Sequence, residues 1–309
     1  MGSLDGRAAI ITGAGRGIGA SVARMFAAEG ARLVLNDLGT ATDGRGSNAS
    51  PVRELEAELR ATGAEVCSDG GDVGDTATGE RLVNLALDRY GQLDVVVNVA
   101  GILRDRMIFN LSEEDWDAVA RVHLRGHYAT IRPAAAYWRS RRNPDGHYRI
   151  VNFTSDAALQ GSPGQPNYAA AKMGIVGLTY SLANALRRYG VTANAVAPDA
   201  STRMTATVPE ERRVETDVPQ DARSSPDNIA PLVTYLASTQ SDWLTGRTLG
   251  AGGYDVTLWN DPQVVERVSS DGPWRLADLA DKLEASFRPR ADGLRPSVFM
   301  SQIPGSHGI

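Results

Sequence analysis

Two consecutive stretches, Arg7-Ala-Ala-Ile-Ile-Thr12 and Gly13-Ala-Gly-Arg-Gly-Ile-Gly19, decide the fold of this chain. The first is a short apolar run typical of a strand, and residues 20–28 have the composition of a helix. Glycines between a strand and a helix let the backbone approach a pyrophosphate, and the start of the helix offers free N–H groups to it. The pattern therefore predicts a nucleotide site formed by Gly13, Gly15, Arg16, Gly17, Ile18 and Gly19.

The next apolar run, 32–36, ends at Asp37. An acid at this place accepts hydrogen bonds from the hydroxyls of an adenosine ribose and repels a 2′-phosphate, which favours NAD over NADP. An aspartate that only begins a loop is the alternative. The polar segment 39–50 is longer than a usual link between a strand and a helix, and we expect a surface loop near the adenosine end.

Two further parts of a cofactor site are expected where the third and fourth strands end. Asp72 and Val73 follow the third strand, and Asp72 either meets an adenine amino group or takes part in a turn. Asn98, Ala100 and Gly101 follow the fourth strand, where small residues let a ribose lie against the backbone. Open α/β sheets place their ligand crevice at such strand ends.

Ser155, Tyr168 and Lys172 form the predicted catalytic centre. An apolar strand over 148–153 precedes Ser155, and a helix begins near Tyr168, so Tyr168 and Lys172 project from one helix face. A phenol with a pKa of ~10 is a poor base at neutral pH. A nearby ammonium favours the phenolate, which then takes a proton from an alcohol while a serine hydroxyl holds the oxygen. An ordinary amphipathic tyrosine–lysine pair is the alternative.

His123 and the segment after Pro198 leave two questions open. His123 is either a satisfied core histidine or a member of the catalytic site. Residues 199–228 are polar and predict a lid over the substrate. The arginines in this segment either meet substrate phosphates or form a solvated face; they are Arg203, Arg212, Arg213 and Arg223.

Composition excludes several classes of function. The 309 residues have a net charge of −5 and no basic tract, so nucleic acid is not an expected partner. A single cysteine, Cys67, excludes an intramolecular disulfide, and the four histidines lack the spacing of a metal site. No apolar run approaches the ~18 residues that a membrane span needs. With no charged-then-apolar leader, a cytoplasmic setting is expected.

The composition changes after Gly253. Residues 1–253 are expected to form the nucleotide-binding domain. Residues 254–309 form a C-terminal extension, helical over 274–287, that docks on the core or on a partner subunit.

Five motifs together resemble the classical short-chain dehydrogenase/reductase family, over about residues 4–253. They are Thr12-Gly-Ala-Gly-Arg-Gly-Ile-Gly19, Asn98-Val-Ala-Gly101, Ser155, Tyr168-x-x-x-Lys172 and Asn194-Ala-Val-Ala-Pro198.

This resemblance implies an α/β fold of the Rossmann type, with a doubly wound, seven-stranded parallel sheet and a nicotinamide cofactor. It implies that Tyr168 is the acid/base, that Lys172 binds the nicotinamide ribose and lowers the tyrosine pKa, and that Ser155 orients the substrate oxygen. The family usually has asparagine where His123 stands. The cofactor residues it adds are Pro198 and Thr202.

A narrower likeness rests on Leu35-Asn-Asp-Leu-Gly39, Ala100-Gly-Ile-Leu-Arg-Asp105 and Val122-His-Leu-Arg-Gly126. These stretches are similar to the (3R)-hydroxyacyl-CoA dehydrogenase unit of the peroxisomal β-oxidation multifunctional enzyme and its bacterial relatives. The likeness implies NAD-dependent oxidation of a 3-hydroxyacyl-CoA.

We therefore predict an NAD-dependent dehydrogenase that oxidises a secondary alcohol and forms a homodimer or homotetramer. Two alternatives remain open. One is a steroid or terpenoid alcohol dehydrogenase with the same site, and the other is a non-catalytic NAD sensor.

Overall fold

In residues 2–200 and 222–293, which the computed structural model describes, seven parallel strands and one antiparallel strand form one sheet. The order is β3-β2-β1-β4-β5-β6-β7-β8. The central strands are buried on both faces, as parallel strands in α/β proteins are. The strands are β1 (Ala8–Thr12), β2 (Arg32–Asn36), β3 (Val66–Asp69), β4 (Val95–Asn98), β5 (Tyr148–Phe153), β6 (Val191–Asp199), β7 (Thr248–Gly252) and β8 (Asp255–Leu258).

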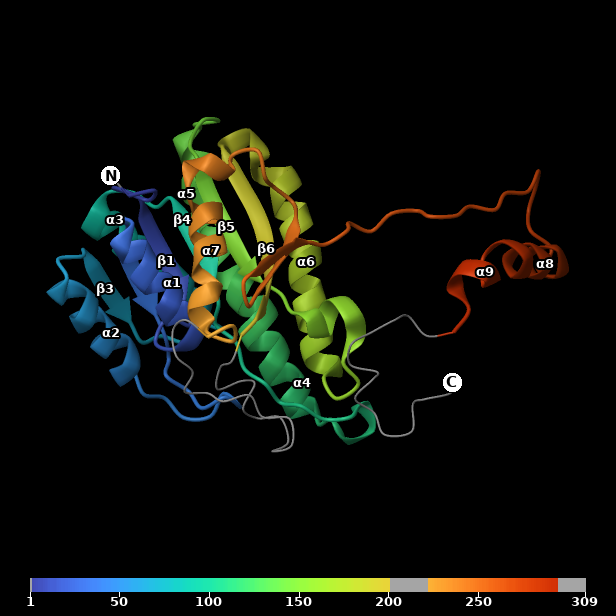
Figure 1. Cartoon of the computed structure of the whole chain (residues 1–309), viewed down its shortest axis with the longest axis horizontal. Helices are drawn as coiled ribbons and strands as arrows, with labels where there is room; N and C mark the ends of the chain where they lie inside the picture. The colour runs from blue at the N-terminus through green and yellow to red at the C-terminus, as the bar shows by residue number, and fades with distance from the viewer. Residues whose placement is uncertain (1, 201–221, 294–309) are drawn as a thin grey trace.

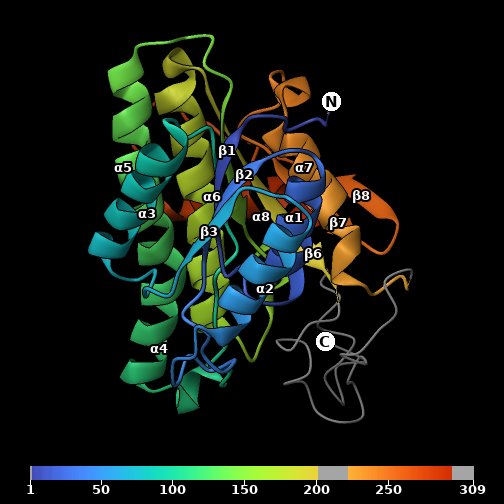
Figure 2. The ribbon, with the colours of Figure 1, turned by 90° about the vertical axis from the view of Figure 1, so that its left-hand side faces the viewer.

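Helices cover both faces of the sheet, which gives three layers (Figures 1 and 2). Neighbouring side chains on one strand serve opposite layers: Ile11 packs toward α1, α2 and α7, whereas Ile10 packs toward α3, α5 and α6. The helices are α1 (Gly17–Ala28), α2 (Ser50–Ala61), α3 (Thr76–Tyr90), α4 (Glu113–Ala120), α5 (Gly126–Arg141), α6 (Pro166–Leu186), α7 (Ala230–Ala237), α8 (Leu276–Ser286) and α9 (Arg288–Ala291).

Short helical segments join these elements. Two of them, η2 and η3, are π-helical, and η2 lies between α4 and α5. Wide turns of this kind are frequent at functional sites. The segments are η1 (Ile108–Asn110), η2 (Arg121–Arg125), η3 (Ala157–Gly161), η4 (Arg187–Tyr189), η7 (Pro226–Asn228) and η8 (Thr239–Ser241).

The doubly wound parallel sheet predicted from the sequence is confirmed over β1–β7, but the predicted count of seven strands omits β8. Strand β8 folds back on β7 in an antiparallel pair that joins Gly252 to Asp255. Gly253 between them has φ +57°, a conformation that favours glycine and allows the tight turn. Val256 and Leu258 are exposed, so burial of a side-chain face does not hold this strand in place.

The C-terminal extension leaves the core soon after β8. Trp259 packs beside Leu159 and Val176, and Asp261 pairs with Arg247 at 2.9 Å. Beyond them, α8 and α9 lie away from the sheet (Figure 1), and no residue of α8 is buried. Docking of this part on a partner subunit stays a prediction. No helix in the described ranges is long and apolar enough to cross a membrane.

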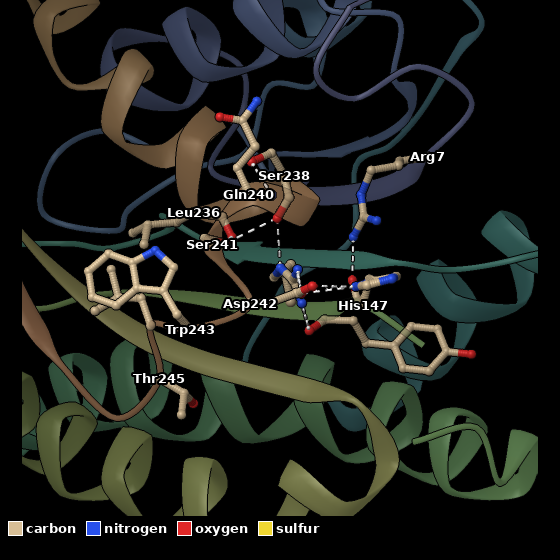
Figure 3. A network of polar contacts seen from close by, with 12 residues as sticks. Arg7, His147, Leu236, Ser238, Gln240, Ser241, Asp242, Trp243 and Thr245 are labelled. Carbon is tan, nitrogen blue, oxygen red and sulfur yellow. Dashed lines mark hydrogen bonds and ion pairs between the residues drawn. The ribbon is translucent and has the colours of Figure 1, made fainter. Parts of the chain in front are cut away.

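A polar network lies at the amino end of β5 (Figure 3). Its centre is Arg149, which is buried and donates to the backbone oxygens of Ser238 at 2.9 Å and Tyr148 at 3.0 Å. Arg149 also pairs with the carboxylate of Asp242, which accepts a bond from His147. This network ties β5 to the chain that follows α7, on the edge of the sheet opposite the cavity described next.

Candidate active site

A cavity of about 510 Å³ lies at the carboxyl edge of the sheet, where the strand order reverses between β1 and β4. Ligands of open α/β sheets bind at such a switch point. The wall combines the glycine turn after β1, the chain after β2, β3 and β4, and the start of α6. The predicted site residues on this wall are Gly13, Arg16, Gly17, Ile18, Gly19, Asp37, Asp72, Val73, Ala100, Gly101, His123, Tyr168, Lys172 and Pro198.

The glycine turn brings backbone N–H groups to the cavity. Gly13 has φ +66°, and a Cβ there would lie 2.7 Å from the backbone nitrogen of Ala100, so a larger residue does not fit. Helix α1 starts at Gly17 without a side-chain cap and without an acid in its first turn. Its first N–H groups are therefore available to an anion in the cavity.

Asp37 stands directly after β2 and is held by two backbone N–H groups. Its Oδ2 accepts from Gly15 at 2.8 Å and its Oδ1 accepts from Gly39 at 2.6 Å. Gly15 thus supports Asp37 from outside the cavity wall. A carboxylate oxygen has two lone pairs, so each oxygen of Asp37 keeps acceptor capacity for a ligand.

Asp72 takes part in a turn and in an ion pair. Its Oδ1 accepts from the backbone N–H of Gly74 at 2.8 Å, and its Oδ2 pairs with Arg121 Nη1 at 2.7 Å. The turn role left open in the sequence analysis is therefore present, and Asp72 and Val73 also line the cavity. The pair with Arg121 fixes the wall at this side.

Asn98 lies behind the cavity wall rather than on it. Its Nδ2 donates to Asn152 Oδ1 at 3.1 Å, and its Oδ1 accepts from Thr130 Oγ1 at 2.6 Å. Asn98 is buried, and these bonds join β4 to β5 and α5. It supports the strand end from which Ala100 and Gly101 reach the cavity.

Ser155, Tyr168 and Lys172 are brought together by β5 and α6. The Ser155 hydroxyl acts on the Tyr168 phenol and lowers its pKa, although Ser155 itself is not among the residues that line the cavity. Lys172 is buried, its Nζ donates to the Phe153 carbonyl oxygen at 2.7 Å, and this nitrogen lies 5.6 Å from the centroid of the Tyr168 ring. An ammonium has three N–H donors, and one is used by Phe153.

His123 is both a buried histidine and part of the cavity wall. Its Nε2 lies 2.8 Å from the backbone oxygen of Ile102 and 3.1 Å from the backbone nitrogen, so it bonds Ile102 in either tautomer. Its ring meets the Tyr168 ring edge to face, with centroids 5.2 Å apart. Burial, with the Lys172 charge, lowers the His123 pKa well below its ordinary value. The neutral imidazole positions Tyr168 from the side.

The lid prediction is only partly within the described residues. Pro198 of β6 and Pro226 of η7 line the cavity. Thr202 lies outside the described residues, as do Arg203, Arg212 and Arg213. Arg223 pairs with Asp255 at 2.9 Å and stacks over Tyr254. It is therefore engaged with the C-terminal extension rather than directed to the cavity.

Comparison with known proteins fits this geometry. A family model described as enoyl-(acyl carrier protein) reductase, a group of short-chain dehydrogenases/reductases, matches residues 13–254. The chain belongs to the short-chain dehydrogenase/reductase family. It is therefore an oxidoreductase that acts on hydroxyl groups and uses a nicotinamide cofactor, NAD or NADP.

Individual members of the family are similar over most of the chain. The hydroxyacyl-CoA dehydrogenase ChsB1 of Mycobacterium tuberculosis is 42% identical over 93% of this chain and 90% of its own length. The peroxisomal multifunctional enzyme type 2 of Mus musculus is 39% identical over 83% of this chain, which spans 33% of that enzyme. A solved short-chain dehydrogenase from Mycobacterium avium is 42% identical, with a TM-score of 0.83, over 96% of this chain and 98% of its own.

The cavity of this short-chain dehydrogenase/reductase fits a nicotinamide dinucleotide on its own geometry. The uncapped start of α1 suits the pyrophosphate. Asp37 retains acceptors for ribose hydroxyls, and Lys172 retains donors. In the described residues, no group of three or more His, Cys, Asp and Glu side chains is arranged to hold a metal ion.

The protonation of the tyrosine–lysine pair differs from the sequence expectation. Burial raises the pKa of Tyr168 to about 12; the Ser155 hydrogen bond lowers it in part, and the Asp105 charge raises it further. Burial lowers the pKa of Lys172 to about 7. The net shift of the Tyr168 pKa is upward, not downward as expected, because loss of water around the phenol dominates and Lys172, with a pKa of about 7, is only partly charged near neutral pH.

Several wall residues were not predicted from the sequence. Arg121 follows α4, where its charge resembles that of any solvated helix face. Arg104 and part of the loop after β2 also line the cavity, although that loop was expected only near the adenosine end. The unpredicted wall residues include Leu38, Thr40, Ala41, Thr42, Gly44, Arg104 and Arg121.

Proposed function

We propose that this chain uses NAD to oxidise a secondary alcohol to a ketone, and that the alcohol is the 3-hydroxyl group of a hydroxyacyl-CoA. The observation that carries the proposal is that Tyr168 and Lys172, with Nζ 5.6 Å from the ring centroid, line the same cavity as Asp37, and that the Ser155 hydroxyl acts on the phenol. The choice of substrate is supported by the names of the similar proteins, a hydroxyacyl-CoA dehydrogenase and a peroxisomal multifunctional enzyme.

Each residue has a role in this reaction. The bound cofactor supplies the ring carbon that accepts the hydride. With a pKa of about 12 the Tyr168 phenol holds its proton near neutral pH, so it accepts the proton of the alcohol only once its own proton has passed on toward Lys172. Ser155 donates a hydrogen bond to the alcohol oxygen while the carbonyl forms. Lys172 directs its remaining N–H groups to the nicotinamide ribose and passes protons to and from the buried site, for which a pKa near neutrality suits it.

The cofactor preference rests on Asp37. Its two oxygens accept ribose hydroxyls, and its negative charge repels a 2′-phosphate. Arg16 also lines the cavity and could attract that phosphate, but Asp37 is fixed by Gly15 and Gly39 directly after β2. We therefore expect NAD to be used at least about tenfold better than NADP, and the Asp37→Ser variant to reduce that ratio.

A substrate panel with NAD and NADP tests the proposal by formation of the reduced cofactor. Turnover of a (3R)-hydroxyacyl-CoA with NAD supports it. Turnover of steroid or terpenoid alcohols without turnover of a hydroxyacyl-CoA would show that the substrate is an alcohol of that other class. A preference for NADP overturns the proposed role of Asp37. Binding of NAD without turnover of any alcohol favours a sensor and overturns the enzymatic proposal.

We also propose that the chain forms a homo-oligomer through the helical face that contains α4, α5 and α6. Large apolar side chains are exposed there, namely Trp116, Tyr128 and Met173. Large apolar side chains left exposed on neighbouring helices are a feature that interaction sites share. Light scattering at micromolar concentration should give a dimer or tetramer, and a strict monomer would contradict this assembly.

A further inference from the structure

Part of the loop after β2 crosses the cavity. We call residues 40–44 the strap, and four of its five residues line the cavity wall. The strap has no regular secondary structure, and a bond from Gly44 N–H to the Ala41 oxygen at 3.0 Å holds its turn. Gly39 and Gly46 flank it with positive φ angles of 72° and 74°. Glycine pairs of this kind allow a loop to change direction at both ends.

The strap is fastened to the chain that follows β4, on the other lip of the cavity. The backbone N–H of Leu103 donates to the Thr42 oxygen at 2.9 Å. Arg104 Nε donates to the Asp43 oxygen at 2.9 Å. These two hydrogen bonds therefore join the strap, which follows β2, to the chain that follows β4, and they hold it over the cavity.

Arg104 continues from the strap to the catalytic helix. Its guanidinium also bonds Glu114 at 3.0 Å and Asp115 at 3.2 Å at the start of α4, and the side chain is 12% exposed. Its backbone oxygen accepts from Asn167 at 3.1 Å, next to Tyr168. A guanidinium that is bonded to the Asp43 oxygen, Glu114 and Asp115 is well ordered. It therefore fixes the strap more firmly than the backbone bond from Leu103 does alone.

We propose that Arg104 is a positioning residue that fastens the strap over the bound dinucleotide, so that release of its bond to Asp43 precedes cofactor entry and exit. This inference rests on the proposed function and deepens it. The other walls are strand ends and helix starts within the packed layers, whereas the strap is held by the two bonds across the cavity. Opening the strap thus separates cofactor exchange from hydride transfer, as loop motions do in many enzymes.

The test compares the wild-type protein with Arg104→Gln and with the matched control Arg106→Gln. Arg106 is an exposed neighbour whose guanidinium bonds only the adjacent Asp105 oxygen among the contacts described. Bound NADH is displaced by excess NAD and its fluorescence is followed by stopped flow. We expect NADH release to accelerate about tenfold in Arg104→Gln and to stay within about twofold of wild type in Arg106→Gln. Single-turnover hydride transfer should stay within about threefold of wild type in Arg106→Gln, and in Arg104→Gln it should change by less than NADH release does.

A second readout uses the protein without cofactor. Hydrogen exchange at the Leu103 amide, which bonds Thr42, should be faster in Arg104→Gln, with unchanged exchange in β4. If Arg104→Gln does not fold, Arg104→Lys replaces it, because lysine keeps the charge but lacks the fork. Equal NADH release from wild type and the Arg104 variant overturns the inference alone. Failure of the wild-type protein to bind NADH overturns the proposed function as well.

Discussion

A buried basic side chain lies at each end of strand β5: Arg149 of β5 at the amino end and Lys172 of α6 at the carboxyl end. The two differ in the groups that they contact. Arg149 at the amino end is bonded to two backbone oxygens and paired with Asp242. Lys172 at the carboxyl end donates to the Phe153 oxygen and, within the described ranges, has no carboxylate partner. Burial lowers the pKa of both groups, and that of Lys172 reaches about 7.

The difference in partners distinguishes Arg149, whose charge supports the packing, from Lys172, whose charge is available for the proposed reaction. A buried charge paired within the chain is satisfied before any ligand arrives, so it stabilises one packing arrangement. A buried charge with one neutral partner is left with donors to offer and with a pKa near the operating pH. The carboxyl end of β5 therefore suits the proposed chemistry, whereas the amino end holds β5 to the chain that follows α7.

The largest expected effect concerns the phenol beside the unpaired cation. Tyr168→Phe removes the proton acceptor and leaves the ring that packs on His123. Turnover of the alcohol should fall at least about 10³-fold, because general acid–base catalysis supplies rate factors of this size. Calorimetric titration should show NAD affinity within about threefold of wild type. Retained turnover would show that the carboxyl end of β5 is not the catalytic centre.

The second prediction concerns the effect of pH on stability through Lys172. Its pKa is about 7 in the folded chain and ~10.4 in the unfolded chain, so the unfolded chain binds more protons between these values. The free energy of unfolding therefore rises with pH through this window and does not depend on Lys172 below it.

Denaturant unfolding of wild type and Lys172→Met checks this prediction. Relative to the variant, the wild type should gain on the order of 3 kcal/mol between about pH 7 and about pH 9.5. Other titrating groups are common to both proteins and cancel in the difference. A constant difference across the window would mean that Lys172 is charged and compensated like Arg149.

The third prediction concerns the paired cation. Arg149→Met leaves the oxygens of Tyr148 and Ser238 without their donor, and should lower the free energy of unfolding by about 2 kcal/mol. The turnover rate of the folded fraction should stay within about twofold of wild type, because Arg149 is at the opposite edge of the sheet. Asp242→Asn should be milder, since that side chain is 48% exposed. If Arg149→Met lost turnover without losing stability, the structural role assigned to Arg149 would be wrong.

The smallest effect is expected at Asp105, whose charge raises the Tyr168 pKa. Asp105→Asn keeps the shape of the side chain and an acceptor for Gln165, which donates to Asp105 at 2.9 Å. Removal of the charge lowers the Tyr168 pKa, so the pH–rate profile for oxidation should move to lower pH. The rate at neutral pH should rise by no more than about threefold. A profile that moves to higher pH would contradict the electrostatic role of Asp105.

Local sequence patterns predict the parts of this fold that are built from neighbours in the chain. The apolar run 148–153 matches β5, and the spacing of Tyr168 and Lys172 places both on one face of α6. The glycine turn and Asp37 meet at the cavity because parallel strands end at a common edge. The doubly wound sheet follows from the same alternation of strands and helices.

Contacts between distant segments are not encoded in such patterns. Nothing near Asn98 predicts its partner Thr130, and nothing near Arg104 predicts its bond to Asp43. Strand β8 alternates polar and apolar residues over Asp255–Leu258, but it is only four residues long and wholly exposed, so its place beside β7 depends on the turn between the two strands rather than on burial. The Tyr168 pKa is set by burial, a property of the assembled structure.

The most direct test of this account is an NMR titration of the Lys172 side chain. The chain has two lysines, Lys172 and Lys282, so selective lysine labelling gives two signals, and Lys282→Arg assigns them. The account predicts that the Lys172 signal titrates near pH 7 in the folded protein. Titration of Lys172 near the ordinary ~10.4 of a solvated lysine would contradict it.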